Sequence, residues 1–173
     1  MAYPVEEERQ VALRNNVTAL IRPSRASDVQ RLQELFYNLS EGDVFTRFFA
    51  YLKSLSVSSA QQLCNVNYKD EMAFLAVVEK DEEEHIIGSS CYVVDPSTNM
   101  AEVAYMIHPQ WQKNGVGSAL QQRMIEYARS KGLRGFTAGV LVENERMIRL
   151  IEKSGCSVST SRSSRVCEIT MTL

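Results

Sequence analysis

The sequence is poor in the residues that build zinc sites and disulfide frameworks. It has only two histidines, His85 and His108, and they lie far apart. Its four cysteines are scattered, and no two of them form a C-x-x-C pair. A structural zinc site needs four such ligands at characteristic spacings, which are missing here, so we expect no metal.

Long apolar runs and a dominant charge are also absent. No stretch approaches the roughly 20 apolar residues that a membrane-spanning helix needs. Residues 1–10 are acidic and lack the basic and then apolar layout of a signal peptide. With a net charge of -2, the chain has no general attraction to nucleic acid or to anionic membranes. We therefore expect a cytoplasmic protein that has neither of these as a partner.

The composition that is present is that of a globular protein. Hydrophobic residues make up 45% of the 173 positions and charged residues 23%, as in ordinary soluble domains. This length suits one domain with its own core. Residues 1–16 are polar and show no periodicity, so we interpret them as an N-terminal arm. Residues 17–173 are expected to form a single domain.

Strand-like and helix-like segments alternate along the chain, which indicates an α/β fold. Apolar runs bounded by turn residues predict strands over 18–22, 72–79, 86–94, 100–107 and 136–142, with one or two more in 157–173. Apolar residues at helical spacing predict helices over 29–39, 45–55, 116–132 and 144–154, and a short one over 58–66. The main elements follow the order β-α-α-β-β-β-α-β-α-β-β. That order gives a central sheet of six to seven strands flanked by helices.

The most informative segment is Gln112-Lys-Asn-Gly-Val-Gly117, which follows a predicted strand and begins a predicted helix. The first N–H groups of a helix have no partner within the helix, and the helix dipole places partial positive charge there. Gly115 and Gly117 carry no Cβ atom, so a phosphate group can approach the backbone closely. The segment therefore predicts a site for the diphosphate of a cofactor.

Other interpretations of this segment compete with that one. A Walker A loop needs G-x-x-x-x-G-K-[ST], which the sequence lacks. A dinucleotide fingerprint needs G-x-G-x-x-G, but Leu120 stands where the third glycine belongs. Glu143 does follow the next strand at about the place of a ribose-binding acid. The glycines could also form a turn that binds nothing, and the motif alone does not decide.

Two segments taken together resemble the GNAT superfamily of acetyltransferases. The first is Gln112-x-x-Gly115-x-Gly117 after the strand 102–107, which looks like the acyl-CoA loop of that superfamily. The second is Asn144-x-x-Met147-x-x-Leu150 with the segment 153–156, which resembles its second conserved segment. The combination covers about the C-terminal half of the chain and is far more specific than either piece.

Segments of the N-terminal half are similar to the bacterial Pat-type protein lysine acetyltransferases: 21–24, 35–36, 39–40 and 47–49. Domains of this type are often fused to regulatory or acyl-CoA-processing domains, so the resemblance is compatible with a chain that is one piece of a longer protein. It implies a mixed sheet splayed into a V, in which two neighbouring parallel strands part and admit acyl-CoA.

The resemblance also implies which residues bind acetyl-CoA, the expected co-substrate. Backbone groups of Met106 and Ile107 would pair with its pantetheine arm, and Asn144 would hydrogen-bond the same arm. The pyrophosphate would rest on the loop and the first helical turn, formed by Gln112, Lys113, Asn114, Gly115, Val116, Gly117 and Ser118.

Transfer to an amine requires that the amine lose its proton, because a lysine with a pKa of about 10.4 is almost wholly ammonium at pH 7. A general base is therefore expected. In the Pat-type pattern the acid of an A-E-x-A segment has this role, and here that acid is Glu102. His108 is the rival, since imidazole titrates near the working pH. Many GNAT enzymes use a tyrosine of the second segment as general acid, whereas Ile151 stands at that position here.

The sequence thus predicts an enzyme that moves an acetyl group from acetyl-CoA directly onto a primary amine. The preferred acceptor is a lysine side chain of a protein, such as an acyl-CoA-metabolising enzyme. Two alternatives stay open. One is a transferase for a small amine or amino acid, and the other is a non-catalytic module that senses acyl-CoA.

Overall fold

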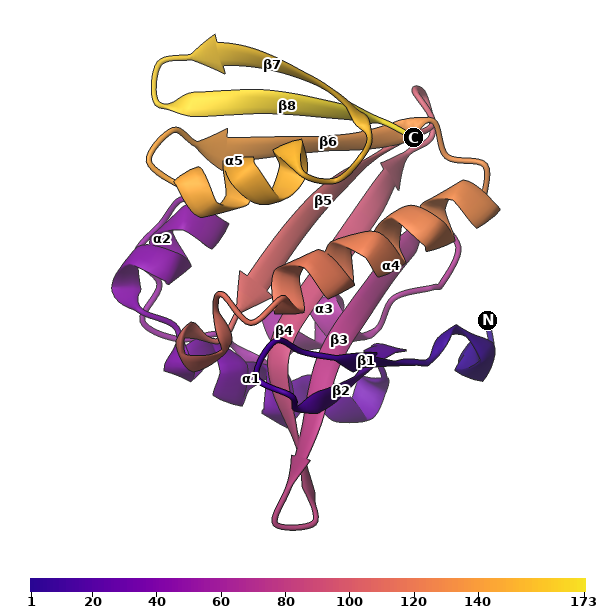
Figure 1. The fold of residues 1–173 in the computed structure, drawn as a ribbon, viewed down its shortest axis with the longest axis vertical. Helices are drawn as coiled ribbons and strands as arrows, with labels where there is room; N and C mark the ends of the chain where they lie inside the picture. The colour runs from indigo at the N-terminus through magenta and orange to yellow at the C-terminus, as the bar shows by residue number, and fades with distance from the viewer.

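A computed structural model describes residues 1–173 as one eight-stranded sheet with five α-helices (Figure 1). The strands are β1 (Arg9–Ala12), β2 (Thr18–Pro23), β3 (Glu71–Lys80), β4 (Glu83–Asp95), β5 (Met100–Ile107), β6 (Gly135–Leu141), β7 (Ser157–Ser163) and β8 (Val166–Thr172). The α-helices are α1 (Val29–Asn38), α2 (Glu41–Phe48), α3 (Val57–Cys64), α4 (Val116–Ser130) and α5 (Glu145–Glu152). None of the helices is both long and apolar enough to cross a membrane.

The strands lie in the order β1-β2-β3-β4-β5-β6-β8-β7, and only β5 and β6 are parallel neighbours. Helix α4 connects these two, as a parallel pair requires a crossover. They pair only where Met100–Glu102 meets Gly135–Thr137, and beyond those three residue pairs they diverge. The expected α/β class and its V-shaped sheet are therefore confirmed.

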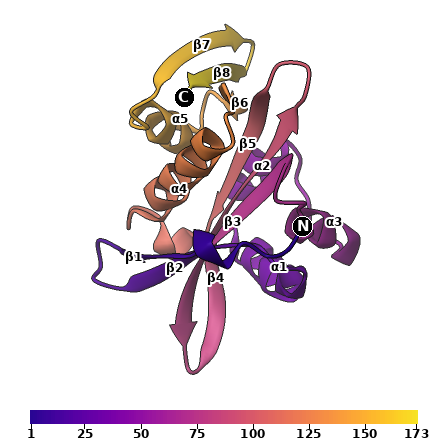
Figure 2. The same ribbon diagram turned by 90° about the vertical axis from the view of Figure 1, so that its right-hand side faces the viewer.

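Helices cover both faces of the sheet. Figure 2 shows α4 and α5 on one face, with α1 and α3 on the other and α2 near the end of β5. The larger core lies between the sheet and α4 and includes Phe74, Tyr92, Leu120, Met124 and Phe136. A smaller core joins α1 to the opposite face through Leu32, Leu35, Leu75 and Met106. The apolar stripes of these two helices thus hold them against opposite sides of the sheet.

The sheet has one strand more than the six to seven expected. The additional strand is β1, which lies in the segment interpreted as an arm and pairs antiparallel with β2. No residue of β1 is fully buried, and only Val11 is half-buried. Without a buried face the segment carries no alternation of apolar and polar residues, so its pairing rests on backbone hydrogen bonds that the pattern does not reveal.

Three helices precede β3, as the expected helices over 29–39, 45–55 and 58–66 imply, but the bounds of the second differ. The second was expected over 45–55 but begins at Glu41, where the Ser40 hydroxyl caps it by accepting from Asp43 N at 3.0 Å. It ends at Phe49, which adopts a left-handed conformation with φ of 54°. The short third helix, α3, is capped by the Ser56 hydroxyl.

Candidate active site

A cavity of about 390 Å³ opens where β5 and β6 part. Its walls include residues 103–107 of β5, 138–140 of β6, the loop before α4, and the inner side of α5. Met106 and Ile107, to which the resemblance assigns pantetheine contacts, belong to this stretch of β5. Because β6 has turned away, the β6-facing backbone groups of β5 have no partner in the sheet. They are free to bond an extended ligand.

Helix α4 begins at this cavity, and its first turn is open to a ligand. Gly115 precedes the helix in the left-handed region, with φ of 91°, and no side chain caps the helix. Gly115, Val116, Gly117 and Ser118 all line the cavity. The N–H groups of the first turn lack partners within the helix, and the helix dipole adds partial positive charge. This arrangement suits an anionic group such as a diphosphate.

The two glycines of the loop meet different requirements. Gly115 supplies a backbone conformation that other residues adopt only with strain. Gly117 lets two helices approach, because a Cβ atom there would lie only 3.3 Å from Cδ2 of Leu150 on α5. The motif therefore shapes the wall of the cavity as well as the approach to the helix.

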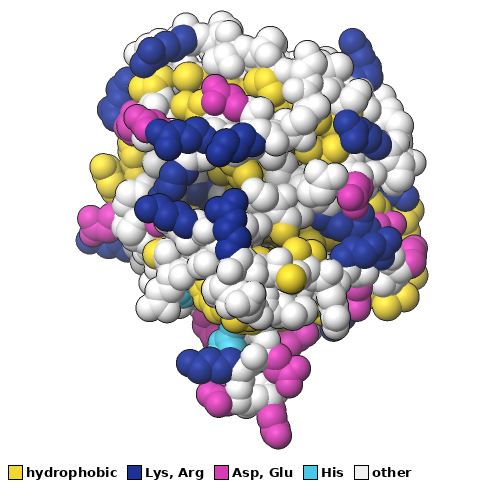
Figure 3. All heavy atoms as spheres, in the orientation of Figure 1, with side chains coloured by type: hydrophobic (Ala, Val, Ile, Leu, Met, Phe, Trp, Pro, Cys, Tyr) yellow, Lys and Arg dark blue, Asp and Glu magenta, His cyan; other side chains and the backbone are white.

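The cavity is strongly cationic although the chain carries a net charge of -2. Its lining includes six basic side chains and one acid, Asp43: the basic residues are Arg14, Arg47, Lys113, Arg146, Arg149 and Lys153. Figure 3 shows lysine and arginine side chains gathered around a hollow on the face that carries α4 and α5. Such a concentration of positive charge attracts a polyanionic ligand.

Arg14 is a lining residue that the sequence analysis missed. The turn between β1 and β2 brings it to the glycine loop, residues 112–117 before α4, where its backbone N–H donates to the Asn114 carbonyl at 3.0 Å. Its guanidinium donates to the Lys113 carbonyl at 3.3 Å. Residues 99 positions apart meet here, so no local motif could have found this contact.

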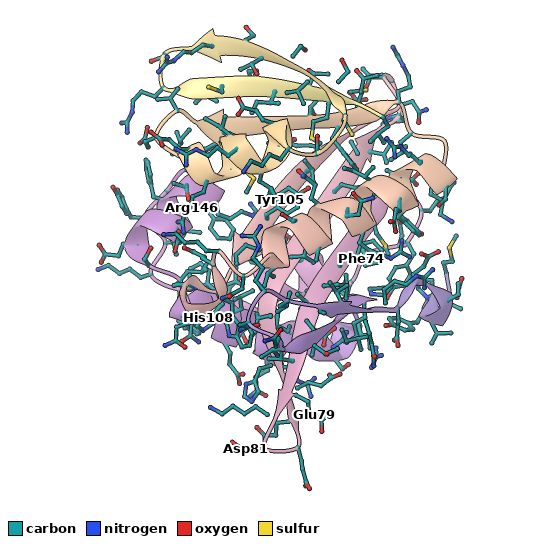
Figure 4. All side chains as sticks on the ribbon, in the orientation of Figure 1. Phe74, Glu79, Asp81, Tyr105, His108 and Arg146 are labelled. Atoms are coloured by element: carbon teal, nitrogen blue, oxygen red, sulfur yellow. The ribbon has the colours of Figure 1, made fainter.

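Asp43 of α2 joins two walls of the site. One carboxylate oxygen accepts from Gln112 Nε2 at 3.3 Å, and the other accepts from Arg146 at 2.9 Å. Gln112 also donates to the Ile107 carbonyl at 3.3 Å. In Figure 4, Arg146 lies between α5 and α2. Asp43 therefore holds α2 close to both the glycine loop and α5.

Asn144, to which the resemblance assigns a hydrogen bond with the pantetheine arm, stands at the start of α5 and lines the cavity. Its Oδ1 accepts from Met147 N at 3.3 Å and so caps the helix. The amide nitrogen makes no bond within the protein, and it is the group available to a ligand. Asn114, in contrast, is not a lining residue, because its side chain donates back to the Gln112 carbonyl at 3.4 Å.

Glu102 lies at the point where the strands separate. It is the last residue of β5 that pairs with β6, opposite Thr137, and its side chain is exposed rather than part of the cavity lining. Alternation along the strand puts Glu102 on the same face as Ala104, which does line the cavity. Residues two apart on a strand are about 6.7 Å apart, so the carboxylate stands beside the cavity.

The other residues weighed from sequence lie away from the cavity. His108 accepts from Gln110 N at 3.2 Å through Nδ1, a capping role, and burial lowers its pKa. Ile151 is completely buried in the larger core and offers no polar group. Glu143, considered for ribose binding, instead pairs on the surface with Arg165 at 2.5 Å.

Comparison with known proteins agrees with this geometry. The acetyltransferase (GNAT) domain model matches residues 19–157. Acetyltransferase PA5475 of Pseudomonas aeruginosa is 32% identical over 115 residues, which cover 66% of this chain and 62% of that protein. Acetyltransferase Pat of Mycolicibacterium smegmatis is 27% identical over 146 residues, which cover 84% of this chain and 43% of that protein. The chain thus spans less than two thirds of either relative.

A solved structure extends the likeness over the whole chain. The GNAT domain of S. lividans PAT superimposes with a TM-score of 0.90 at 27% identity, covering 99% of this chain and 100% of that one. The splayed parallel pair, the uncapped glycine loop before α4 and the sequence matches all agree. This chain belongs to the GNAT acetyltransferase family.

Proposed function

We propose that this protein transfers the acetyl group of acetyl-CoA directly onto the amine of a protein lysine side chain. The observation that carries the proposal is the cationic cavity between the parted strands, which ends on the open first turn of α4. An extended thioester with a phosphorylated tail matches both features. Its arm would pair with the free edge of β5, and its diphosphate would bind the N–H groups of α4.

The same geometry supports specific roles for the lining side chains. Arg14 and Lys113 flank the open turn and would neutralise phosphate charge, while Asn144 would donate to an amide carbonyl of the pantetheine arm. Asn114 and Gln112 would act through the shape of the loop, because their side chains bond to it. A backbone N–H near Met106 on the β6-facing edge of β5, where the strands diverge, would stabilise the oxyanion of the tetrahedral intermediate.

Glu102 is the proposed general base. Only the neutral amine attacks a thioester, and freeing it at pH 7 costs roughly 4–5 kcal/mol for an ordinary lysine. Glu102 stands on the face of β5 that faces away from α4, so an acceptor reaching the thioester from that side would pass it. Since the carboxylate is exposed and lies outside the cavity lining, a water molecule would relay the proton.

The surface beside Glu102 is uncovered, which favours a protein rather than a small amine as the acceptor of the acetyl group. On the face of the sheet that carries Glu102, Gly139 of β6 is exposed and lines the cavity. The neighbouring Glu168 of β8 is exposed too, and its carboxylate lies 3.8 Å from where a Gly139 Cβ atom would stand. The two carboxylates would attract a cationic lysine, and the uncovered surface leaves room for the protein that carries it.

A thiol-release assay with a lysine peptide tests the proposed base. Glu102→Gln should lower kcat about 100-fold or more, within the usual range for removing a general base. It should leave the Kd for acetyl-CoA unchanged, because Glu102 lies outside the cofactor cavity. The matched control is Glu83→Gln, an exposed strand glutamate at the far end of β4, which should keep full activity. Equal turnover of the two variants would rule out Glu102 as the base.

The alternatives give different results in the same assay. A transferase for small amines would turn over free amines or amino acids faster than lysine peptides. A non-catalytic sensor would bind acetyl-CoA but release thiol only at the background rate, in the native protein and in Glu102→Gln alike.

A further inference from the structure

Tyr105 of β5 has a buried hydroxyl group without a partner. The side chain is only 6% exposed, and the hydroxyl oxygen forms no hydrogen bond within the protein. Tyr105 also lines the cavity between β5 and β6. A buried hydroxyl without a hydrogen-bond partner lowers the stability of the folded protein, so an unsatisfied group of this kind requires an explanation. A ligand in the cavity would supply the missing partner.

The position of Tyr105 places it near the reacting end of such a ligand. It lies three residues beyond the last pairing of β5 with β6 and is buried in the core that α4 shares with the sheet. Figure 4 shows it where β5, α4 and α5 meet. Strand alternation points Glu102 and Tyr105 to opposite faces of β5. If the cofactor binds as proposed above, its thioester lies between the two side chains.

No other buried hydroxyl is available to the cavity. Only two further lining residues carry a hydroxyl, Thr46 and Ser118. Thr46 donates to the Asp43 carbonyl at 3.0 Å, and Ser118 is exposed at the start of α4. On α5, Ile151 is buried and has no polar group. Tyr105 is therefore the one lining residue whose buried side chain carries a hydrogen-bond donor.

We propose that the Tyr105 hydroxyl donates a hydrogen bond to the sulfur of coenzyme A as the thioester breaks. This proposal rests on the function proposed above. The amine nitrogen attacks the thioester carbonyl carbon, and the new C–N bond forms. The C–S bond then breaks, and its electron pair stays on sulfur. The proton of the amine leaves through Glu102 and water. Tyr105 stabilises the thiolate and keeps its own proton.

The environment of Tyr105 fits a donor that does not ionise. Burial raises the pKa of its phenol well above the ordinary value of about 10. A coenzyme A thiol has a pKa near 8.5, so the phenol cannot hand over its proton completely. It can still donate a strong hydrogen bond to a thiolate in a water-poor site. The thiolate would take its proton from solvent on release.

Tyr92 provides a matched control. Its hydroxyl is also buried without a partner, and burial raises its pKa as well. It lies on the adjacent strand β4 but does not line the cavity. A Tyr92→Phe variant therefore reports what loss of a buried hydroxyl does to the fold alone.

The test compares Tyr105→Phe and Tyr92→Phe with the native protein in binding of coenzyme A and of desulfo-coenzyme A over a range of pH. In the native protein and Tyr92→Phe, coenzyme A should bind more tightly than the desulfo compound above the pKa of the bound thiol. Ultraviolet absorbance of the thiolate should show that pKa lowered. In Tyr105→Phe the ratio of the affinity for coenzyme A to that for desulfo-coenzyme A should fall about tenfold. This fall corresponds to a rise of about one unit in the pKa of the bound thiol. The kcat should fall by a similar factor with KM for the acceptor unchanged.

Two results would overturn the proposal, and they differ. If all three proteins bind coenzyme A with the same thiol pKa, Tyr105 has no role but the proposed function stands. If the native protein binds neither compound, both the role of Tyr105 and the proposed function fail. Melting temperatures confirm that each variant is folded.

Discussion

Gly115 carries the strictest backbone requirement at the level of single residues. Its φ of 91° turns the chain into α4 so that the open N–H groups face the cavity. An alanine at this position is strained in the left-handed region, by about 1 kcal/mol. The strain would be relieved by rotating the turn, which would move the N–H groups away from the phosphate.

Gly115→Ala should therefore weaken acetyl-CoA binding by about tenfold, the change that 1.4 kcal/mol produces. Calorimetric titration measures it directly. Gly132→Ala is the control, because Gly132 also has a positive φ, of 72°, with no atom near its missing Cβ and no place in the cavity. Both variants should lose similar stability, but only the first should lose affinity. An unchanged Kd in Gly115→Ala would show that the turn does not hold the phosphate.

At the level of elements, the β1–β2 hairpin extends the lining of the cavity beyond the residues that match the family model. The family match begins at residue 19, whereas Arg14 reaches the glycine loop from the turn that precedes residue 19. The backbone bond from Arg14 to Asn114 fixes the turn against the loop. The hairpin thus delivers one cation to a cavity whose other walls come from β5, β6, α2, α5 and the start of α4 with its preceding loop.

Arg14→Ala should raise the Kd for acetyl-CoA by about tenfold, the effect expected for one charge-assisted hydrogen bond at an exposed site. The loss should shrink at high salt, where the native interaction is already screened. Arg9→Ala on the same hairpin is the control, since Arg9 bonds only to the nearby Glu6 and Glu8 carbonyls. Equal affinities of the two variants at low salt would remove Arg14 from the site.

A second element-scale feature is the buried ion pair that attaches α1 to the sheet. Arg22 of β2 donates to both oxygens of Asp28, at 2.8 and 2.7 Å, and both side chains are fully buried. Burial opposes ionisation of Asp28, but the guanidinium of Arg22 outweighs it and holds the Asp28 pKa below its usual range. Stability from this pair is present above the unfolded pKa near 3.9 and is lost as pH falls through the folded value.

Asp28→Asn should lower the free energy of unfolding at pH 7 by about 3 kcal/mol, because it leaves the Arg22 charge buried without its main partner. Glu84, at 3.2 Å from Arg22, limits the loss. Urea unfolding from pH 7 down to pH 3 measures both effects. As the pH falls, the free energy of unfolding should decrease more steeply for the native protein than for the variant, because the variant lacks the Asp28 carboxyl group. Parallel pH profiles would show that Asp28 does not contribute to acid sensitivity.

At the scale of the whole molecule, charge is distributed unevenly. The chain is slightly acidic, yet basic side chains dominate the cavity. At about 100 times its Kd, acetyl-CoA should add about 2.7 kcal/mol to the unfolding free energy. For a chain of this size the melting temperature should rise by about 5 °C or more. A nicotinamide dinucleotide at the same concentration should produce no shift, and a rise with both ligands would point to unselective anion binding.

Local chemistry made the main features of the fold predictable from sequence. The glycine turn before α4, the helix that follows residue 144 and the apolar runs of β3 to β5 each depend on neighbours within a few residues, and the structure has all of them. The pattern missed β1 because that strand has no buried face. It also gave α2 a wrong start, since the Ser40 cap lies upstream of the apolar run that was used to place the helix.

The sequence by itself determined the α/β class, the family resemblance and the glycine turn before α4, because each is encoded in short motifs and in hydrophobic periodicity. The tertiary structure alone decided which distant side chains complete the cavity. Arg14 reaches the loop across 99 positions, and Arg146 reaches Asp43 across 103. The tertiary structure also places the Tyr105 hydroxyl, without a hydrogen-bond partner, beside the point where β5 and β6 part. Such contacts depend on how the whole sheet twists and packs, which no local pattern of residues specifies.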